Sequence, residues 1–141
     1  MMTEISLNVL DVSENSTRAG ASLVSISVTA DTVHDKLTIV IADDGCGMTA
    51  EQVAHVTDPF FTTRTTRKVG LGIPFFKYAA ESTGGSFHIE SEPGKGTTVT
   101  AVFGLSHIDR MPLGDMNATI HNLIVYHPDT DFLYTYTYND A

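Results

Sequence analysis

The sequence of 141 residues has one cysteine, no tryptophan and no long apolar run, and only 8 lysines and arginines oppose 17 acidic residues. A lone Cys46 cannot form an intramolecular disulfide, which favours a reducing compartment. No segment is long enough to cross a bilayer, and the first residues lack the basic start of a secretion signal. A net charge of −9 argues against a nucleic-acid partner, whose phosphates would be repelled. The sequence therefore predicts a cytoplasmic protein without nucleic-acid or membrane partners.

The few bases are unevenly placed. Arg64, Arg67 and Lys68 fall within five residues and make up three of the eight. On an acidic protein such a cluster either marks an anion site or is a solvated basic loop, and charge alone favours the loop.

Length and hydrophobic content, 141 residues and 42%, favour one soluble globular domain. Hydrophobic periodicity predicts four helices and five strands. Thr49 and Gln52 form a capping box, and Pro112 is predicted to open the last helix. The helices are expected at residues 5–19, 49–56, 71–83 and 113–125, and the strands at 23–29, 37–42, 86–91, 97–103 and 132–138. This order predicts an α+β fold, a two-layer sandwich with helices on one face of a mixed, mostly antiparallel sheet.

The composition changes after Gly104. We therefore expect a main unit at residues 1–104 and a helix–strand extension at 105–141 packed on it. The last strand would place Phe132, Tyr134, Tyr136 and Tyr138 on one face. That face is a partner or homodimer edge or, as we favour, ordinary core packing.

Two glycine-rich segments suggest a ligand site. Asp43 ends an apolar strand and is followed by Gly45 and Gly47, so the backbone can approach a flat ligand while the carboxylate accepts a hydrogen bond from an amine. An ordinary turn explains these residues equally well. Gly70 and Gly72 lie at the mouth of a helix, where exposed N–H groups favour phosphate, although the segment is neither a P-loop nor a dinucleotide fingerprint.

Two further features are weak when taken alone. Residues 90–98 read as a hairpin turn that needs no function. Asp11 and Asn15 are four residues apart and share one helix face. An inward-facing pair would need partners such as magnesium and phosphate, whereas a solvent-facing pair would need none.

Together and in this order, these segments resemble the GHKL family, the ATP-binding domains of gyrase, heat-shock chaperones, histidine kinases and MutL. The matching boxes are residues 11–21, 43–48, 58–63, 70–73 and 94–97. The resemblance covers about residues 5–104 and implies the Bergerat fold of that family. The box at 58–63, Asp-Pro-Phe-Phe-Thr-Thr, is similar to that of histidine kinases.

The resemblance also implies roles for individual residues. Asn15 would hold Mg²⁺, Asp43 would bind the adenine amine, and Thr97 would lie beneath the base. A short lid, residues 60–69, would bring the basic side chains of Arg64, Arg67 or Lys68 to the phosphates. The implied ATP-binding residues are Asn15, Asp43, Gly45, Gly47, Met48, Phe60, Thr62, Thr63, Arg64, Arg67, Lys68, Val69, Gly70, Leu71, Gly72 and Thr97.

One position departs from the family pattern. Asp11 stands where the ATP-hydrolysing members have a glutamate as general base, and it is one methylene shorter. Glu14 lies next to Asn15 but is rotated away from that face by the helical period. Asp11 is therefore the candidate catalytic residue, and slow hydrolysis is expected.

The phosphoacceptor is not evident. Few residues precede the first helix, so we expect no phosphoacceptor hairpin, and none of the six histidines has the acidic neighbour on a helix that such a site usually shows. Two functions remain open. We expect the chain to be a stand-alone kinase that phosphorylates a partner protein in trans during signalling. Alternatively, it is a nucleotide-dependent binding switch or a slow ATPase.

Overall fold

The computed structural model describes residues 4–58 and 72–139. These residues form four helices and five strands, and the predicted α+β sandwich is confirmed. The elements are α1 (Ile5–Arg18), β1 (Leu23–Asp31), β2 (Lys36–Asp43), α2 (Ala50–Val56), α4 (Gly72–Glu81), β3 (Ser86–Glu92), β4 (Gly96–Gly104), α5 (Met116–Tyr126) and β5 (Asp131–Tyr138).

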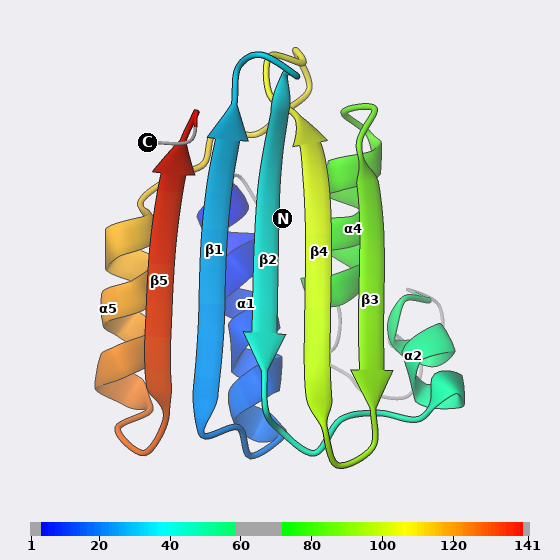
Figure 1. Ribbon diagram of the computed structural model, residues 1–141, viewed down its shortest axis with the longest axis vertical. Coiled ribbons are helices and arrows are strands. Elements are labelled where there is room, and N and C mark those ends of the chain that lie inside the picture. Colours follow the sequence, from blue (N-terminus) through cyan, green and yellow to red (C-terminus); the bar gives the residue numbers. More distant parts are fainter. Residues whose placement is uncertain (1–3, 59–71, 140–141) are drawn as a thin grey trace.

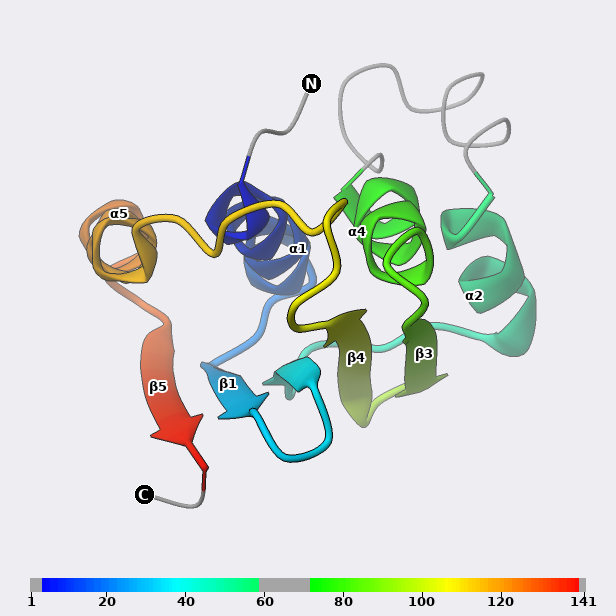
Figure 2. The same cartoon turned by 90° about the horizontal axis from the view of Figure 1, so that it is seen from above.

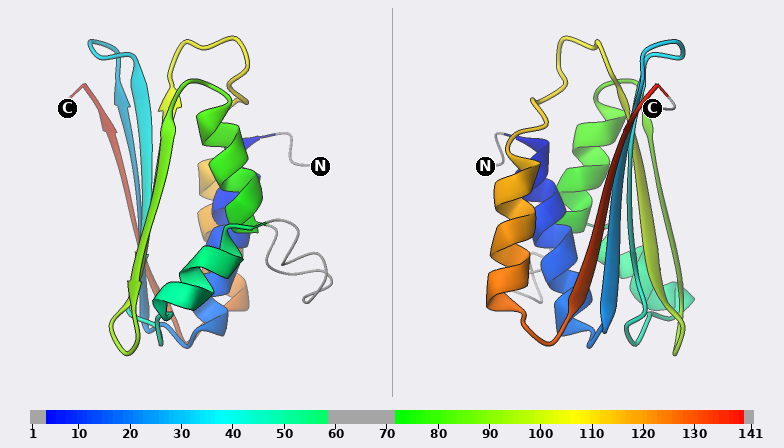
Figure 3. Two further views of the ribbon diagram at one scale, coloured as in Figure 1. Left: turned by 90° about the vertical axis from the view of Figure 1, so that its right-hand side faces the viewer. Right: turned by 60° about the vertical axis from the view of Figure 1, so that its left-hand side comes forward.

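The sheet has the strand order β3-β4-β2-β1-β5 (Figure 1). The first four strands in this order are antiparallel neighbours, whereas β5 runs parallel to β1. Helices α5, α1 and α4 lie side by side on one face of the sheet, and α2 lies beside β3 (Figures 2 and 3). In the described part of the chain no helix is long and apolar enough to span a membrane.

The core lies between the sheet and the helices. Alternate residues of β1, such as Val24, Ile26 and Val28, are buried beneath the helices. The residues between them are smaller and polar, as in Ser25 and Ser27, because that face of the sheet is open to water. The period-two pattern of the sequence thus follows directly from a sheet covered on one side.

The last helix begins later than predicted. Pro112 is not its first residue, and the expected start at residue 113 is wrong, because α5 begins at Met116. Gly114 has a φ of 84°, and the Asp115 side chain accepts a hydrogen bond of 2.9 Å from the Ala118 N–H. The hydrogen bond of this capping acid sets the start of the helix, and Pro112 therefore lies in the connector. By contrast, the capping box of Thr49 and Gln52 is confirmed.

The extension is built into the same sheet. Strand β5 pairs with β1 along its full length. Its aromatic side chains divide into two groups: Phe132 and Tyr134 pack against the core, whereas Tyr136 and Tyr138 are 49% and 50% exposed. Core packing therefore accounts for the two aromatic residues in the first half of the strand.

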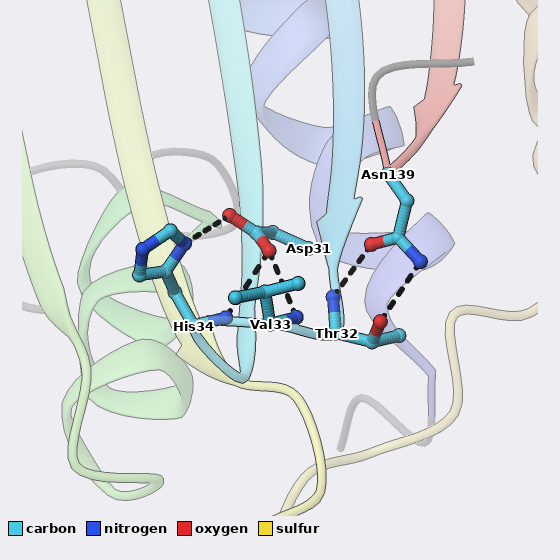
Figure 4. Close-up of polar contacts among 5 residues, drawn as sticks. All are labelled: Asp31, Thr32, Val33, His34 and Asn139. Carbon is cyan, nitrogen blue, oxygen red and sulfur yellow. Dashed lines mark hydrogen bonds and ion pairs between the residues drawn. The ribbon is translucent and has the colours of Figure 1, made fainter.

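Polar contacts also join the extension to the β1–β2 turn (Figure 4). The Asn139 amide accepts a hydrogen bond from the Thr32 N–H and donates one to the Thr32 hydroxyl, both at 2.8 Å. In the same turn Asp31 accepts hydrogen bonds from the N–H groups of Val33 and His34. A further hydrogen bond with the His34 ring, 2.7 Å long, is the main cause of the lowered pKa of Asp31.

We expect α5 to unfold together with the rest of the sandwich. Leu123 is fully buried in α5, so Leu123→Ala should lower the free energy of unfolding by about 2–5 kcal/mol. Val125 lies on the exposed side of the same helix, and Val125→Ala should change that free energy by less than about 0.5 kcal/mol. Urea unfolding followed by circular dichroism measures both. An unchanged main transition in Leu123→Ala would show that the extension folds separately.

Candidate functional site

The carboxylate of Asp43 is held in one orientation at the end of β2. Its Oδ2 accepts a hydrogen bond of 2.6 Å from the Ser16 hydroxyl of α1, and its Oδ1 accepts one of 2.8 Å from the Gly45 N–H. Across the sheet, Asp43 is paired with Thr97 of β4. A carboxylate has about four acceptor positions, so two contacts leave capacity for a ligand that donates a hydrogen bond.

The turn after Asp43 passes very close to the β3–β4 hairpin. Gly47 has a φ of 72°, and a Cβ placed there would lie 2.0 Å from the carbonyl oxygen of Glu92. Gly96 has a φ of 109°, and its Cβ would lie 2.0 Å from the carbonyl oxygen of Asp43. Cys46 joins the same region through its backbone, since its N–H donates to Ala19 and its carbonyl accepts from Gly94. Glycine is therefore required sterically at both positions.

A hydroxyl network orients Thr97. The Ser91 hydroxyl accepts a hydrogen bond of 2.8 Å from the Met48 N–H and lies 2.7 Å from the Thr97 Oγ1. It also lies 3.0 Å from the Gly96 carbonyl, to which it donates. Neither Ser91 nor Ser16 was predicted from the sequence. Ser91 contacts Met48 from 43 residues away and Ser16 contacts Asp43 from 27 residues away, and no local pattern reports such contacts.

Helix α1 carries the second group of candidate residues. Asp11 and Asn15 are half-buried, and the Arg18 guanidinium donates a hydrogen bond to the Asn15 side-chain oxygen. A Cβ on Gly72 would lie 2.8 Å from the Cβ of Asp11, so the first residue of α4 is packed against α1. Burial raises the pKa of Asp11, an effect that Arg18 opposes and Glu14 reinforces.

Two neighbouring acids are directed elsewhere. The Glu14 carboxylate lies 2.7 Å from the His127 Nε2, as expected for a residue rotated away from the Asp11 face. Asp44 accepts hydrogen bonds from the N–H groups of Ser22 and Leu23 and from the Ser22 hydroxyl, and these contacts lower its pKa. Asp44 therefore fixes the start of β1, while Asp43 faces the hollow described next.

A hollow of about 620 Å³ opens beside Asp43 and Thr97, with Val53 of α2 and Ile89 of β3 in its wall. This volume is typical of small-molecule sites. Among residues 4–58 and 72–139 no cluster of three or more His, Cys, Asp or Glu side chains could hold a metal ion. A cation near Asp11 and Asn15 would therefore share its coordination with a ligand or water.

Several predicted site residues lie outside the described residues. These are Phe60, Thr62, Thr63, Arg64, Arg67, Lys68, Val69, Gly70 and Leu71.

The sandwich and the glycine turns around Asp43 define the class of protein as a GHKL-type domain. The family model described as histidine kinase-, DNA gyrase B- and HSP90-like ATPase matches residues 1–107. The chain belongs to this family, and its relatives identify it as a histidine-kinase-like ATPase domain.

The relatives are much longer proteins. A putative sensor protein of Shewanella frigidimarina is 31% identical over 103 residues, which is 72% of this chain and 16% of the relative. Sporulation kinase D of Bacillus subtilis is 31% identical over 98 residues, covering 70% of this chain and 19% of the relative. The sensor histidine kinase ZraS of Klebsiella oxytoca is 38% identical over 65 residues, 46% of this chain and 14% of the relative. The chain thus spans less than a fifth of the length of each of these relatives.

The raised pKa of Asp11 predicts a pH-dependent cost to stability. Its folded-state pKa lies above the ordinary value of 3.8, so the folded state loses stability as the pH rises through this range. Asp11→Asn removes that loss. We expect the variant to melt at a higher temperature than the native protein at pH 7, with the difference shrinking towards pH 3.

Asp44→Asn is the matched control, because the pKa of Asp44 is lowered. Its stabilising effect is present above the ordinary pKa and is lost as the pH falls through the folded-state value. Asp44→Asn should therefore melt at a lower temperature at pH 7. Differential scanning calorimetry from pH 3 to pH 7 measures both variants, and equal signs for the two would contradict this assignment.

Proposed function

We propose that the domain binds ATP with Mg²⁺ and that Asp43 accepts a hydrogen bond from the adenine amine. The observation that carries this proposal is the Asp43 carboxylate, fixed by Ser16 and Gly45 at the hollow beside Thr97. Gly47 lets the turn pass directly against the β3–β4 hairpin, and Thr97 offers a hydroxyl on the strand next to Asp43. Membership of the ATPase family supports the same ligand.

Two side-chain oxygen groups on α1 fit a magnesium ion. Mg²⁺ takes oxygen ligands and is usually held by one or two protein groups together with phosphates and water. The side-chain oxygen of Asn15 and the carboxylate of Asp11 are oxygen donors four residues apart on one helix. When bound, the ion would neutralise phosphate charge. Arg18 already contacts the Asn15 oxygen and would bring a further positive charge close to the phosphates.

The phosphate contacts are proposed from the sequence alone. Gly70 and Gly72 would donate backbone N–H groups, and the basic cluster of Arg64, Arg67 and Lys68 would add charge-assisted hydrogen bonds. Phe60, Thr62, Thr63, Val69 and Leu71 complete this proposed set.

The proposed activity is phosphorylation of a partner protein, in the manner of a histidine-kinase catalytic domain, with Asp11 as the candidate catalytic residue. The histidine kinases among the relatives support this activity. The alternative is a nucleotide-dependent binding switch or slow ATPase. It is favoured by Asp11, whose side chain is shorter than the glutamate that serves as general base in the hydrolysing members of the family. A cytoplasmic location and a partner that acts in trans remain predictions, and a homodimer is one option for the assembly.

Incubation with γ-labelled ATP and a lysate of the native cell tests the kinase proposal. We expect one protein to become labelled with the native domain and to stay unlabelled with Asn15→Ala. Tight ATP binding without any labelled protein would favour the switch.

Asp43→Asn should weaken ATP binding about ten- to hundred-fold, because a hydrogen bond to a charged group contributes about 1.5–3 kcal/mol. Isothermal titration calorimetry measures this loss. The neighbouring Asp44→Asn is the control and should leave the affinity nearly unchanged at a temperature at which both variants are folded. Unchanged affinity in Asp43→Asn would remove the adenine assignment.

Asp11→Glu should raise ATP turnover if a short base limits hydrolysis. A positioned general base contributes on the order of 10²–10⁴ in rate, and it must reach the attacking water. Steady-state phosphate release compares the variant with the native protein. If the native protein hydrolyses ATP rapidly and Asp11→Asn abolishes this activity, an aspartate is long enough to act as the general base.

A further inference from the structure

Strand β5 forms one edge of the sheet (Figure 1). The N–H groups of Asp131 and Asn139 both donate towards β1, to the carbonyls of Ser22 and Ala30, at 2.8 Å and 2.9 Å. Backbone groups alternate in direction along a strand, so the odd-numbered residues of β5 face β1 and the even-numbered residues face outward. In the part of the chain that the structure describes, no strand lies on that outer side. The edge therefore presents a row of N–H and C=O groups from residues 132, 134, 136 and 138.

The opposite edge of the sheet is protected in ways that β5 is not. Strand β3 carries Glu90 and Glu92, and α2 lies beside it (Figures 1 and 2). Charged side chains and covering elements keep edge strands from pairing with other chains. Residues 132–138 of β5 are Phe-Leu-Tyr-Thr-Tyr-Thr-Tyr, without a charge or a proline. Strand β5 is thus the edge of this sheet at which a further strand can pair.

The two halves of β5 differ in how far the chain itself covers their aromatic side chains. Phe132 and Tyr134 pack against the core, whereas Tyr136 and Tyr138 lie on the same face and are 49% and 50% exposed. Helix α5, which precedes the strand, has 11 residues and a length of about 16 Å, whereas the 8 residues of the strand extend about 26 Å. The helix is therefore too short to cover the second half of the strand.

A second copy of β5 would supply that cover. If two copies run antiparallel about a two-fold axis at Thr135, Phe132 of one copy lies opposite Tyr138 of the other, and Tyr134 lies opposite Tyr136. All four are outward-facing residues, so each pair can exchange two backbone hydrogen bonds. Cross-strand aromatic pairs stabilise such a contact further. The covered half of each strand then meets the exposed half of the other, and no other antiparallel register pairs all four residues.

The distribution of charge favours the same contact. Each copy carries a net charge of −9, so the acidic surfaces of two copies repel one another. Asp131 is the only charged residue of β5, and in this register it lies opposite Asn139, a neutral amide. The preceding helix α5 contains no Asp, Glu, Lys or Arg. Two copies would thus approach one another through elements that carry almost no charge.

We propose that β5 pairs with β5 of a second copy, antiparallel about Thr135, and that this contact joins the two five-stranded sheets of a homodimer into one. No residue of β5 lines the hollow beside Asp43, so the contact is separate from the proposed nucleotide site. A contact made by one strand is smaller than a standard interface of about 800 Å² per partner, so the dimer is weak. We expect a Kd on the order of 10 µM.

Analytical ultracentrifugation of the full chain, at concentrations about tenfold below and tenfold above this Kd, measures the association. Tyr136→Lys places a charge at the outward edge, where lysine commonly blocks strand pairing. It should weaken the dimer about tenfold or more, because the two-fold axis doubles the loss of one aromatic pair. His88→Lys is the matched control. It adds the same charge to the other edge strand, where the His88 side chain is 67% exposed, and should leave the Kd unchanged. Circular dichroism at the lowest concentration checks that both variants are folded.

Cross-linking tests the register and distinguishes a second copy from a strand of another protein. In a Cys46→Ser background, Thr135→Cys places two thiols opposite each other at the axis, where antiparallel Cα atoms lie about 4.5 Å apart, within the range of a disulfide. Thr137→Cys is the control, since its two copies would be displaced by four residues, about 13 Å, along the strands. Mild oxidation should give a disulfide-linked dimer with Thr135→Cys and not with Thr137→Cys.

A native chain that stays monomeric at the highest concentration overturns the proposal and leaves the edge to a strand of another protein. A dimer whose Kd is the same in Tyr136→Lys overturns it as well, as does equal cross-linking at positions 135 and 137. None of these measurements requires nucleotide, so their outcome is distinct from failure of the ATP proposal.

Discussion

The backbone of the turn at residues 43–48 lies so close to the β3–β4 hairpin that no side chain fits between them. At Gly47 and at Gly96 a Cβ would overlap a carbonyl oxygen of the opposite segment. Asp43 and Thr97 owe their positions to this approach, because each lies at the end of a strand that enters it. The hydroxyl of Ser91 then joins the two segments through Met48 and Thr97. The glycines of the motif are thus required by the fold itself, whatever ligand the site binds.

Helix α1 connects this turn to the rest of the molecule. Ser16 bonds to Asp43, and Asp11 lies against the first residue of α4. On another side, Glu14 contacts His127, which follows α5. Different residues of one helix therefore contact the turn at Asp43, the first residue of α4 and the C-terminal extension. A helix surrounded in this way has little freedom to shift, which suits a scaffold for ligand contacts.

Local signals in the sequence were sufficient for most of the fold. The alternation in β1 and the capping box at Thr49 predicted a strand and a helix start correctly, because both depend on neighbouring residues. The start of α5 was missed because Pro112 is a common first helical residue, whereas Asp115 caps the helix only after the bend at Gly114. Ser16 and Ser91 could not have been found in this way, since their contacts depend on how distant segments meet. The family resemblance singled out Asp43 rather than Asp44, and in the structure Asp43 lies at the hollow, whereas Asp44 bonds to the start of β1.

The overall charge sets a condition on the proposed nucleotide. A chain of net charge −9 repels a triphosphate at long range, so attraction must come from groups within a few ångströms. Salt at physiological strength limits long-range repulsion to about 8 Å, whereas contacts inside a partly buried site are screened much less. Arg18 beside Asn15 is one source of such local attraction. The proposed backbone N–H groups and the proposed magnesium ion on α1 would be others. The acidic surface and an anion-binding site are therefore compatible, provided that the donors are concentrated where α1 meets the start of α4.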